Sequence, residues 1–234
     1  MPWDFWLIFF LLAVLIPWRG QVRLKTLLTR PAVGTKEKLA LYGSTIGFQW
    51  ILMGIVAWRA FARGLTAAQL GLATRFTFQL AWITFAGAVL FGAFQWFNLR
   101  RISRMTGEVP DFMRKLARRI LPGTPLELAP YCALALTAGV CEEFLYRGFA
   151  MAALSRAGLA SWAVVLISSI LFGFAHTYQG KSGVGGTSLM GLVLGTTRAV
   201  VPTLLPVTVW HSVVDIVAGI AGPKYLLVDP KDVR

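Results

Sequence analysis

Long runs of apolar residues, separated by short polar segments, extend through most of the chain. A membrane-crossing helix needs about 20 consecutive and mostly apolar residues. We therefore expect an all-α fold, a polytopic transmembrane helical bundle of about seven spans. The predicted spans are 3–18, 39–58, 76–97, 131–153, 161–178, 187–201 and 203–220, and the last boundary, around residues 198–202, is the least sharply marked.

The same pattern divides the chain into three parts. Residues 1–125 hold the first spans and two basic connecting segments, residues 126–222 hold the spans that carry most of the intramembrane polar groups, and residues 223–234 form a short tail. Composition agrees with a protein solvated by lipid, because 56% of the residues are hydrophobic and 14% are charged, whereas a soluble domain carries about 25% charged residues.

The net charge of +13 is compatible with nucleic-acid binding, but its distribution is not. Basic residues gather in segments 19–38 and 99–120, while the intervening segment 59–75 holds few. Because basic loops stay in the cytoplasm, we expect an N-terminus outside, a cytoplasmic C-terminus and no nucleic-acid partner. The short chain favours a prokaryotic inner or plasma membrane.

The second basic segment also has a helical pattern. Phe112, Met113, Leu116 and Ile120 follow helical spacing, with Arg and Lys side chains between them. This pattern predicts an amphipathic helix that lies on an anionic cytoplasmic leaflet. A solvated basic loop without a specific role is the alternative.

Six ionisable side chains interrupt the carboxyl-terminal apolar runs. A charged group at the bilayer centre costs roughly 2.5–3.5 kcal/mol on insertion scales, so six groups facing lipid would cost on the order of 15–20 kcal/mol. We therefore expect these groups to face one another or water inside the bundle. They are Glu142, Glu143, Arg147, His176, His211 and Asp215, and they include both histidines of the chain.

Helical spacing gives the two adjacent glutamates different directions. Glu143 and Arg147 are four residues apart, on one helix face, where an ion pair neutralises both charges. Glu142 lies about 100° around the helix and points elsewhere. Glu142 is therefore the glutamate that remains free for chemistry.

Two further pairs repeat the four-residue interval: Phe172 with His176, and His211 with Asp215. Three spans thus each direct one face toward a common site. A carboxylate in a poorly solvated site is an effective general base near neutral pH. A nearby imidazole holds the same water and passes a proton to the leaving amine, and a second imidazole hydrogen-bonds the oxyanion. This set of groups predicts peptide hydrolysis by an activated water.

Three motifs occur in order on separate predicted helices: Glu142-Glu143-x-x-x-Arg147, Phe172-x-x-x-His176 and His211-x-x-x-Asp215. Together they resemble the CAAX prenyl endopeptidase and bacteriocin-processing family of intramembrane glutamic endopeptidases. The resemblance covers about residues 131–220, while the first 130 residues match only as apolar spans. It implies that residues 126–222 form a protease-like core bundle.

By this resemblance, Glu142 is the catalytic carboxylate and His176 is its partner on the attacking water, while His211 and Asp215 stabilise the oxyanion. The prenyl-protease branch usually has Asn where this chain has Asp215. An ionised Asp has no proton to donate, so we expect Asp215 either to be protonated or to orient His211, which then donates. We favour the second arrangement.

The same resemblance makes Arg147 a structural or substrate-positioning residue with Glu143 as its counter-ion, and Phe172 a residue packed beside the site. It implies cleavage near a terminus of a membrane-associated protein or peptide substrate, such as a prenylated tail, a bacteriocin leader or a sorting signal. It implies no cofactor and no metal.

Other interpretations of these residues stay open. Zinc could bind His176, His211 and Glu142 with Asp215 behind them, because three nitrogen or oxygen ligands plus water suit catalytic zinc, although no HExxH motif is present. Cys141 with His211 would be a cysteine protease. A proton relay and a non-catalytic membrane scaffold or immunity protein of the same family are the alternatives outside proteolysis.

Overall fold

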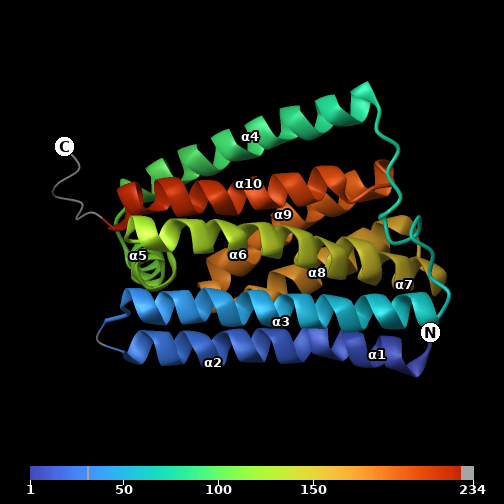
Figure 1. Cartoon of the computed structure of the whole chain (residues 1–234), viewed down its shortest axis with the longest axis horizontal. Helices are drawn as coiled ribbons and strands as arrows, with labels where there is room; N and C mark the ends of the chain where they lie inside the picture. The colour runs from blue at the N-terminus through green and yellow to red at the C-terminus, as the bar shows by residue number, and fades with distance from the viewer. Residues whose placement is uncertain (31, 228–234) are drawn as a thin grey trace.

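The computed structural model describes residues 1–30 and 32–227 as a bundle of helices, and that part of the chain holds no β-strand. This confirms the predicted all-α fold. Most helices follow the long axis of the molecule, so the bundle has two distinct ends (Figure 1). The elements are α1 (Trp3–Phe10), η1 (Leu11–Leu15), α2 (Ile16–Thr29), α3 (Thr35–Ala62), α4 (Phe78–Ser103), α5 (Glu108–Ile120), α6 (Pro125–Glu143), η2 (Phe144–Ala150), α7 (Met151–Arg156), α8 (Ser161–Ala175), η3 (Thr177–Gln179), α9 (Gly180–Val200), α10 (Leu205–Gly222) and η4 (Pro223–Leu227), of which η1, η2 and η4 are π-helical and η3 is a 3₁₀ turn.

Within the described residues, 5 helical segments are long and apolar enough to cross a membrane: Trp3–Thr29, Thr35–Ala62, Phe78–Ser103, Pro125–Arg156 and Leu205–Leu227. Helices α8 and α9 meet the criterion only as a pair, with an angle of 58° between them at the break. The count is therefore five, or six with this pair, against about seven predicted. The difference arises because α8 has only 15 residues, too few to span a bilayer alone.

Small residues bring α8 and α9 into close contact. A methyl group added at Gly191 of α9 would lie 3.0 Å from the Cα atom of Ser169, and one added at Gly173 of α8 would overlap Ser188. The order of these contacts shows that α9 folds back along α8. Small residues allow such close approach of membrane helices.

The first membrane helix extends well beyond its predicted end at residue 18. Elements α1, η1 and α2 form one helical segment, Trp3–Thr29, so Arg19 and Arg23 lie within a helix. The prediction that they belong to a connecting loop was wrong. Sequence interpretation ended the span where the apolar run ends, but Arg, Gln, Lys and Leu are good helix formers and continue the helix.

The two basic segments lie at the same end of the bundle, which we call the basic end. Figure 1 places the connection between α2 and α3, the helix α5 and the end of α10 there, and the N-terminus at the opposite end. Buried Lys38 of α3 ties this end together, because its Nζ donates to the carbonyl of Leu121 at 2.7 Å and to Glu127 Oε2 at 3.1 Å. Which end faces the cytoplasm stays a prediction.

Helix α5 forms where a helix was predicted, but its apolar face is turned toward the bundle. Met113, Ala117 and Ile120 pack in a hydrophobic cluster with residues of α3, α4 and α6. Lys115 and Arg118 are exposed. Helix α5 therefore covers the basic end with its apolar side inward and basic side chains outward.

Helix α10 is wedged between α4 and α6. A methyl group added at Gly87 of α4 would overlap the indole of Trp210, whose N–H donates to a backbone carbonyl of α4 at 2.9 Å. On the other side, a methyl group at Gly139 of α6 would overlap Ser212. Since Trp210 and Ser212 flank His211, these contacts fix the direction of the His211 side chain.

The amino-terminal spans share a hydrophobic core with the carboxyl-terminal ones. Phe5 of α1 meets Phe149 of η2 edge to face, with 5.0 Å between the ring centroids. Both belong to a buried cluster that also contains Leu12 and Phe172. The first helix therefore helps to fix the segment that follows the two glutamates. The division of the chain into three parts stays a prediction.

Candidate functional site

The helix that carries the two glutamates changes its winding directly after them. Helix α6 ends at Glu143 and continues as the π-helical segment η2, all of whose 7 residues are buried. π-Helical turns are rare and are frequent at functional sites. Gly148 is required here for close packing, since a methyl group on it would lie 3.0 Å from the carbonyl oxygen of Leu70.

Glu143 is fully buried and joins two helices. Its Oε1 accepts hydrogen bonds from Arg147 Nη1 and from His211 Nδ1, each at 2.8 Å. Arg147 also donates to a backbone carbonyl of α9 at 3.3 Å, and its guanidinium lies 4.2 Å from the centroid of the Phe172 ring. The structure thus contains the expected ion pair. It also shows that His211 is bonded to Glu143, whereas the sequence suggested that Asp215 would hold the imidazole.

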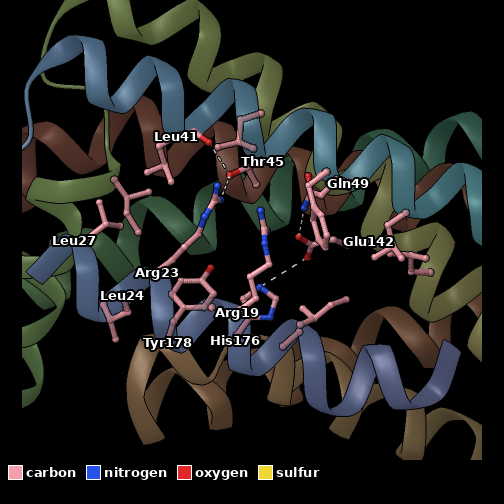
Figure 2. Close-up of a pocket in the computed structure, with 18 of the residues that line it drawn as sticks. Arg19, Arg23, Leu24, Leu27, Leu41, Thr45, Gln49, Glu142, His176 and Tyr178 are labelled. Atoms are coloured by element: carbon pink, nitrogen blue, oxygen red, sulfur yellow. Dashed lines mark hydrogen bonds and ion pairs between the residues drawn. The ribbon is translucent and has the colours of Figure 1, made fainter. Parts of the chain in front are cut away.

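Glu142 points away from this ion pair and lines a cavity (Figure 2). Its Oε1 accepts from Gln49 Nε2 at 2.7 Å, and its Oε2 lies 3.8 Å from His176 Nε2. The adjacent glutamates therefore differ in direction, as helical geometry required. Gln49 of α3 was missed, although an isolated amide within the apolar run 39–58 was a signal that could have found it.

His176 follows the last residue of α8, and its ring is held by the helix it ends. The Nδ1 atom lies 2.8 Å from the carbonyl oxygen of Phe172. A carbonyl only accepts, so Nδ1 donates this bond, and in a neutral imidazole Nε2 is then an acceptor that faces Glu142. Glu142 Oε2 is buried and has no hydrogen-bond partner in the described part of the chain. One water donating a hydrogen to each of these two acceptors would satisfy both.

The Phe172 ring contacts both His176 and His211. The centroid of Phe172 is 4.7 Å from that of His176 and 5.6 Å from that of His211. The Nε2 atom of His211 is 3.6 Å from Asp215 Oδ2, which exceeds hydrogen-bond length. The side chain of His211 is 5% exposed and that of Asp215 is 35% exposed. Every predicted site residue thus belongs to one cluster of connected side chains.

A cavity of about 220 Å³ lies between α2, α3, α6 and η3. Glu142, Gln49 and His176 line it, whereas His211 and Asp215 are not among its lining residues. Tyr146 also lines it, and the Tyr146 hydroxyl is buried without a hydrogen-bond partner among residues 1–30 and 32–227. The rest of the wall is mostly apolar and reaches the basic end, where it is formed by Leu24, Leu27, Leu41, Leu116 and Ile120.

A metal site would need several donors around one point. Across the residues that the structure describes, no group of three or more His, Cys, Asp or Glu side chains is placed to hold an ion. His176, His211 and Glu142, the ligands of the zinc interpretation, therefore do not form such a group.

The apolar helices of the bundle are those of a polytopic membrane protein, and the cluster of acids and histidines is buried among them. The family model described as type II CAAX prenyl endopeptidase Rce1-like matches residues 124–217, a segment that contains every predicted site residue. The match of this segment to a CAAX protease family model supports the resemblance. Comparisons with the curated proteins and with the solved structures gave no match.

Proposed function

We propose that the chain is an intramembrane endopeptidase of the glutamic type, which hydrolyses a peptide bond near a terminus of a membrane-associated protein substrate. The observation that carries this proposal is the position of Glu142 Oε2, 3.8 Å from Nε2 of His176, the ring nitrogen that the Phe172 carbonyl does not engage. Both atoms accept hydrogen bonds and both residues line a cavity within the helices. The family match supports proteolysis in general.

In the proposed mechanism, a water donates one hydrogen to Glu142 and the other to His176, so its lone pairs face the substrate. Glu142 takes the proton as the water oxygen attacks the scissile carbonyl. The proton then passes to the leaving amine, either directly or through His176, and the hydroxyl stays on the new carboxyl group. Gln49 donates to the other oxygen of Glu142 and so keeps Oε2 directed at the water.

We assign stabilisation of the oxyanion to His211 and Asp215. Glu143 fixes the Nδ1 side of His211, so an imidazole protonated on both nitrogens has Nε2–H available as a donor. The Tyr146 hydroxyl, buried and without a partner in the described chain, supplies another donor at the cavity wall. Arg147 has a structural part in this scheme, because it balances the charge of Glu143.

We further propose that the basic end faces the cytoplasm of a prokaryotic inner or plasma membrane, with the N-terminus outside. Basic segments favour this side, and exposed Lys115 and Arg118 of α5 would meet anionic headgroups. A cysteine placed at Lys115, in a background without Cys132 and Cys141, should escape a membrane-impermeant maleimide in intact cells. Labelling from outside would reverse the assigned orientation.

Glu142→Gln tests the catalytic assignment. In native membranes, we expect this variant to accumulate full-length proteins whose termini are lost in cells that contain the unaltered protein, and mapping those termini identifies the substrates. The purified unaltered protein should cut them and the variant should not. Glu108→Gln makes the same chemical change on an exposed residue and should remain active.

Three results would contradict this function. Full activity of Glu142→Gln would refute the glutamic mechanism. Inactivation of the unaltered protein by a zinc chelator, with recovery on adding zinc, would favour a metalloprotease. An unchanged cellular phenotype in Glu142→Gln would favour a non-catalytic scaffold.

A further inference from the structure

Another hollow lies at the basic end, outside the catalytic cavity. It has a volume of about 680 Å³ and lies between helix α5 and the connection of α2 to α3, where Ala32 and Val33 line it. The other side chains that line it all belong to α5, and they are Asp111, Arg114, Lys115, Arg118 and Arg119. None of these residues lines the cavity that contains Glu142. The hollow is therefore a separate candidate for a binding site.

One pair of the charged lining residues is already engaged. Arg114 is buried, and it donates to Asp111 Oδ1 at 2.8 Å and to the backbone carbonyl of Met105 at 2.6 Å. It also donates to the carbonyls of Ile102 and Ser103, each at 3.2 Å. Arg114 therefore fastens α5 to the end of α4. Its ion pair also uses the carboxylate of Asp111, the acidic residue in the wall of the hollow.

Lys115 and Arg118 differ from Arg114 because they are exposed. Across the part of the chain that the structure describes, no hydrogen bond or ion pair joins either side chain to another residue. The two residues are three apart, so their side chains are neighbours on the surface of α5. The hollow therefore presents two adjacent positive charges that no acid of the described chain neutralises, and it is suited to bind an anion.

The position of the hollow indicates where such an anion comes from. Ala32 and Val33 connect the membrane spans Trp3–Thr29 and Thr35–Ala62, and α5 follows the span Phe78–Ser103. The ends of membrane-crossing helices lie at the level of the lipid headgroups. Basic pockets beside transmembrane helices bind anionic headgroups at this level. The bilayer itself therefore supplies an anion of the right charge beside the hollow.

We propose that this hollow binds the headgroup of one anionic phospholipid of the phosphatidylglycerol type, with its phosphodiester on Lys115 and Arg118. Guanidinium and ammonium groups both donate to phosphate oxygens. A glycerol headgroup carries no positive charge, whereas a choline headgroup would place a further cation beside the basic side chains of α5. The inference goes beyond the attraction of α5 for an anionic surface, because it assigns one lipid to one hollow. It does not depend on the proposed protease function.

Native mass spectrometry counts the lipids that stay on the protein. The full chain is released from nanodiscs that contain equal amounts of phosphatidylglycerol and phosphatidylcholine with the same acyl chains. We expect one phosphatidylglycerol to be retained in preference to phosphatidylcholine. The preference should be about twenty- to thirtyfold, because each Lys or Arg near the membrane surface strengthens the binding of an anionic lipid about fivefold.

Variants then assign this preference to the hollow. Lys115→Gln combined with Arg118→Gln should abolish it. Lys36→Gln combined with Arg104→Gln is the matched control, because it removes the same two charges from exposed positions at the start of α3 and the end of α4 that do not line the hollow. The control should keep the preference. Thermal melting checks that each variant is folded, and the single variants Lys115→Gln and Arg118→Gln replace the first pair if it does not fold.

Equal retention of the two lipids would overturn the inference. An equal loss of preference in the test pair and in the control pair would also overturn it, because the overall charge of the protein would then explain the binding. Displacement of the retained lipid by soluble glycerol 3-phosphate, at the concentration at which short-chain phosphatidylglycerol displaces it, would assign the hollow to a free phosphate compound instead of a lipid. Glu142→Gln should show the unaltered preference, so a failure of the proposed catalysis and a failure of this inference are distinguishable.

Discussion

Replacing Glu143 by Gln should destabilise the protein, although the change alters neither the size nor the shape of the side chain. Glu143 and Arg147 are both 0% exposed, so no solvent replaces the lost negative charge. Removing one partner of a buried ion pair costs about 3–5 kcal/mol. The substitution also replaces one carboxylate oxygen by an NH₂ group. The other residues offer little to bind it, because Glu143 Oε2 is already buried without a partner among the described residues.

The same substitution at the neighbouring residue should leave stability nearly unchanged. A Gln in place of Glu142 keeps an oxygen that accepts from Gln49, and the native Glu142 side chain is 19% exposed. We expect a change below about 1 kcal/mol, within the range of substitutions that break no buried network. Catalysis should nevertheless fall by about 10²–10⁴-fold, the usual contribution of a general base.

Thermal unfolding in detergent, followed by tryptophan fluorescence, separates the two variants. One kcal/mol shifts Tm by about 2–4 °C for a chain of this size, so Glu143→Gln should melt about 6–20 °C lower and Glu142→Gln within a few degrees of the unaltered protein. Adding Arg147→Met to Glu143→Gln removes the uncompensated charge and should recover part of the loss. Equal Tm values for the two single variants would refute the inference that Glu143 stabilises the fold and that Glu142 does not.

Three further predictions follow from single contacts. Tyr146→Phe should lower kcat about tenfold or more if its hydroxyl donates to the oxyanion, with little change in Tm because that hydroxyl has no partner in the described chain; unchanged kcat would remove Tyr146 from the mechanism. Gly191→Ala should lower the free energy of unfolding by about 1–3 kcal/mol, because its methyl group would lie 3.0 Å from Ser169 Cα. In the control Gly185→Ala, the added methyl group meets nothing within 4 Å, so thermal unfolding should be nearly unchanged. Asp215→Asn should retain activity in peptide cleavage assays, because His211 is already held by another carboxylate, and complete loss would show that position 215 needs an acid.

Sequence spacing predicted the directions of side chains around their own helices. The four-residue interval gave the ion pair of Glu143 with Arg147, and the 100° step separated Glu142 from both. These relations depend only on the geometry of one helix, so they hold whatever the helix packs against. The ionisable groups also lie inside the bundle, because lipid would not solvate them.

The sequence could not predict which helices turn toward each other. The bond from His211 to Glu143 and that from Gln49 to Glu142 each join distant segments, and helical periodicity does not fix how one helix is rotated against another. Arg19 and Arg23 were assigned to a loop because the apolar run ends before them. Their place in a helix follows from backbone propensity and from the hydroxyl and aromatic partners that α3 provides for their side chains.

The bond between Glu143 and His211 has a consequence for biosynthesis. Glu143 enters the membrane with α6, but His211 arrives only with α10, which follows α6, α8 and α9 in the chain. Until then, His211 and Asp215 are missing from the polar cluster, and Arg147 is the cluster's partner for the Glu143 carboxylate. A nascent chain should therefore lack the complete cluster until α10 has entered the membrane.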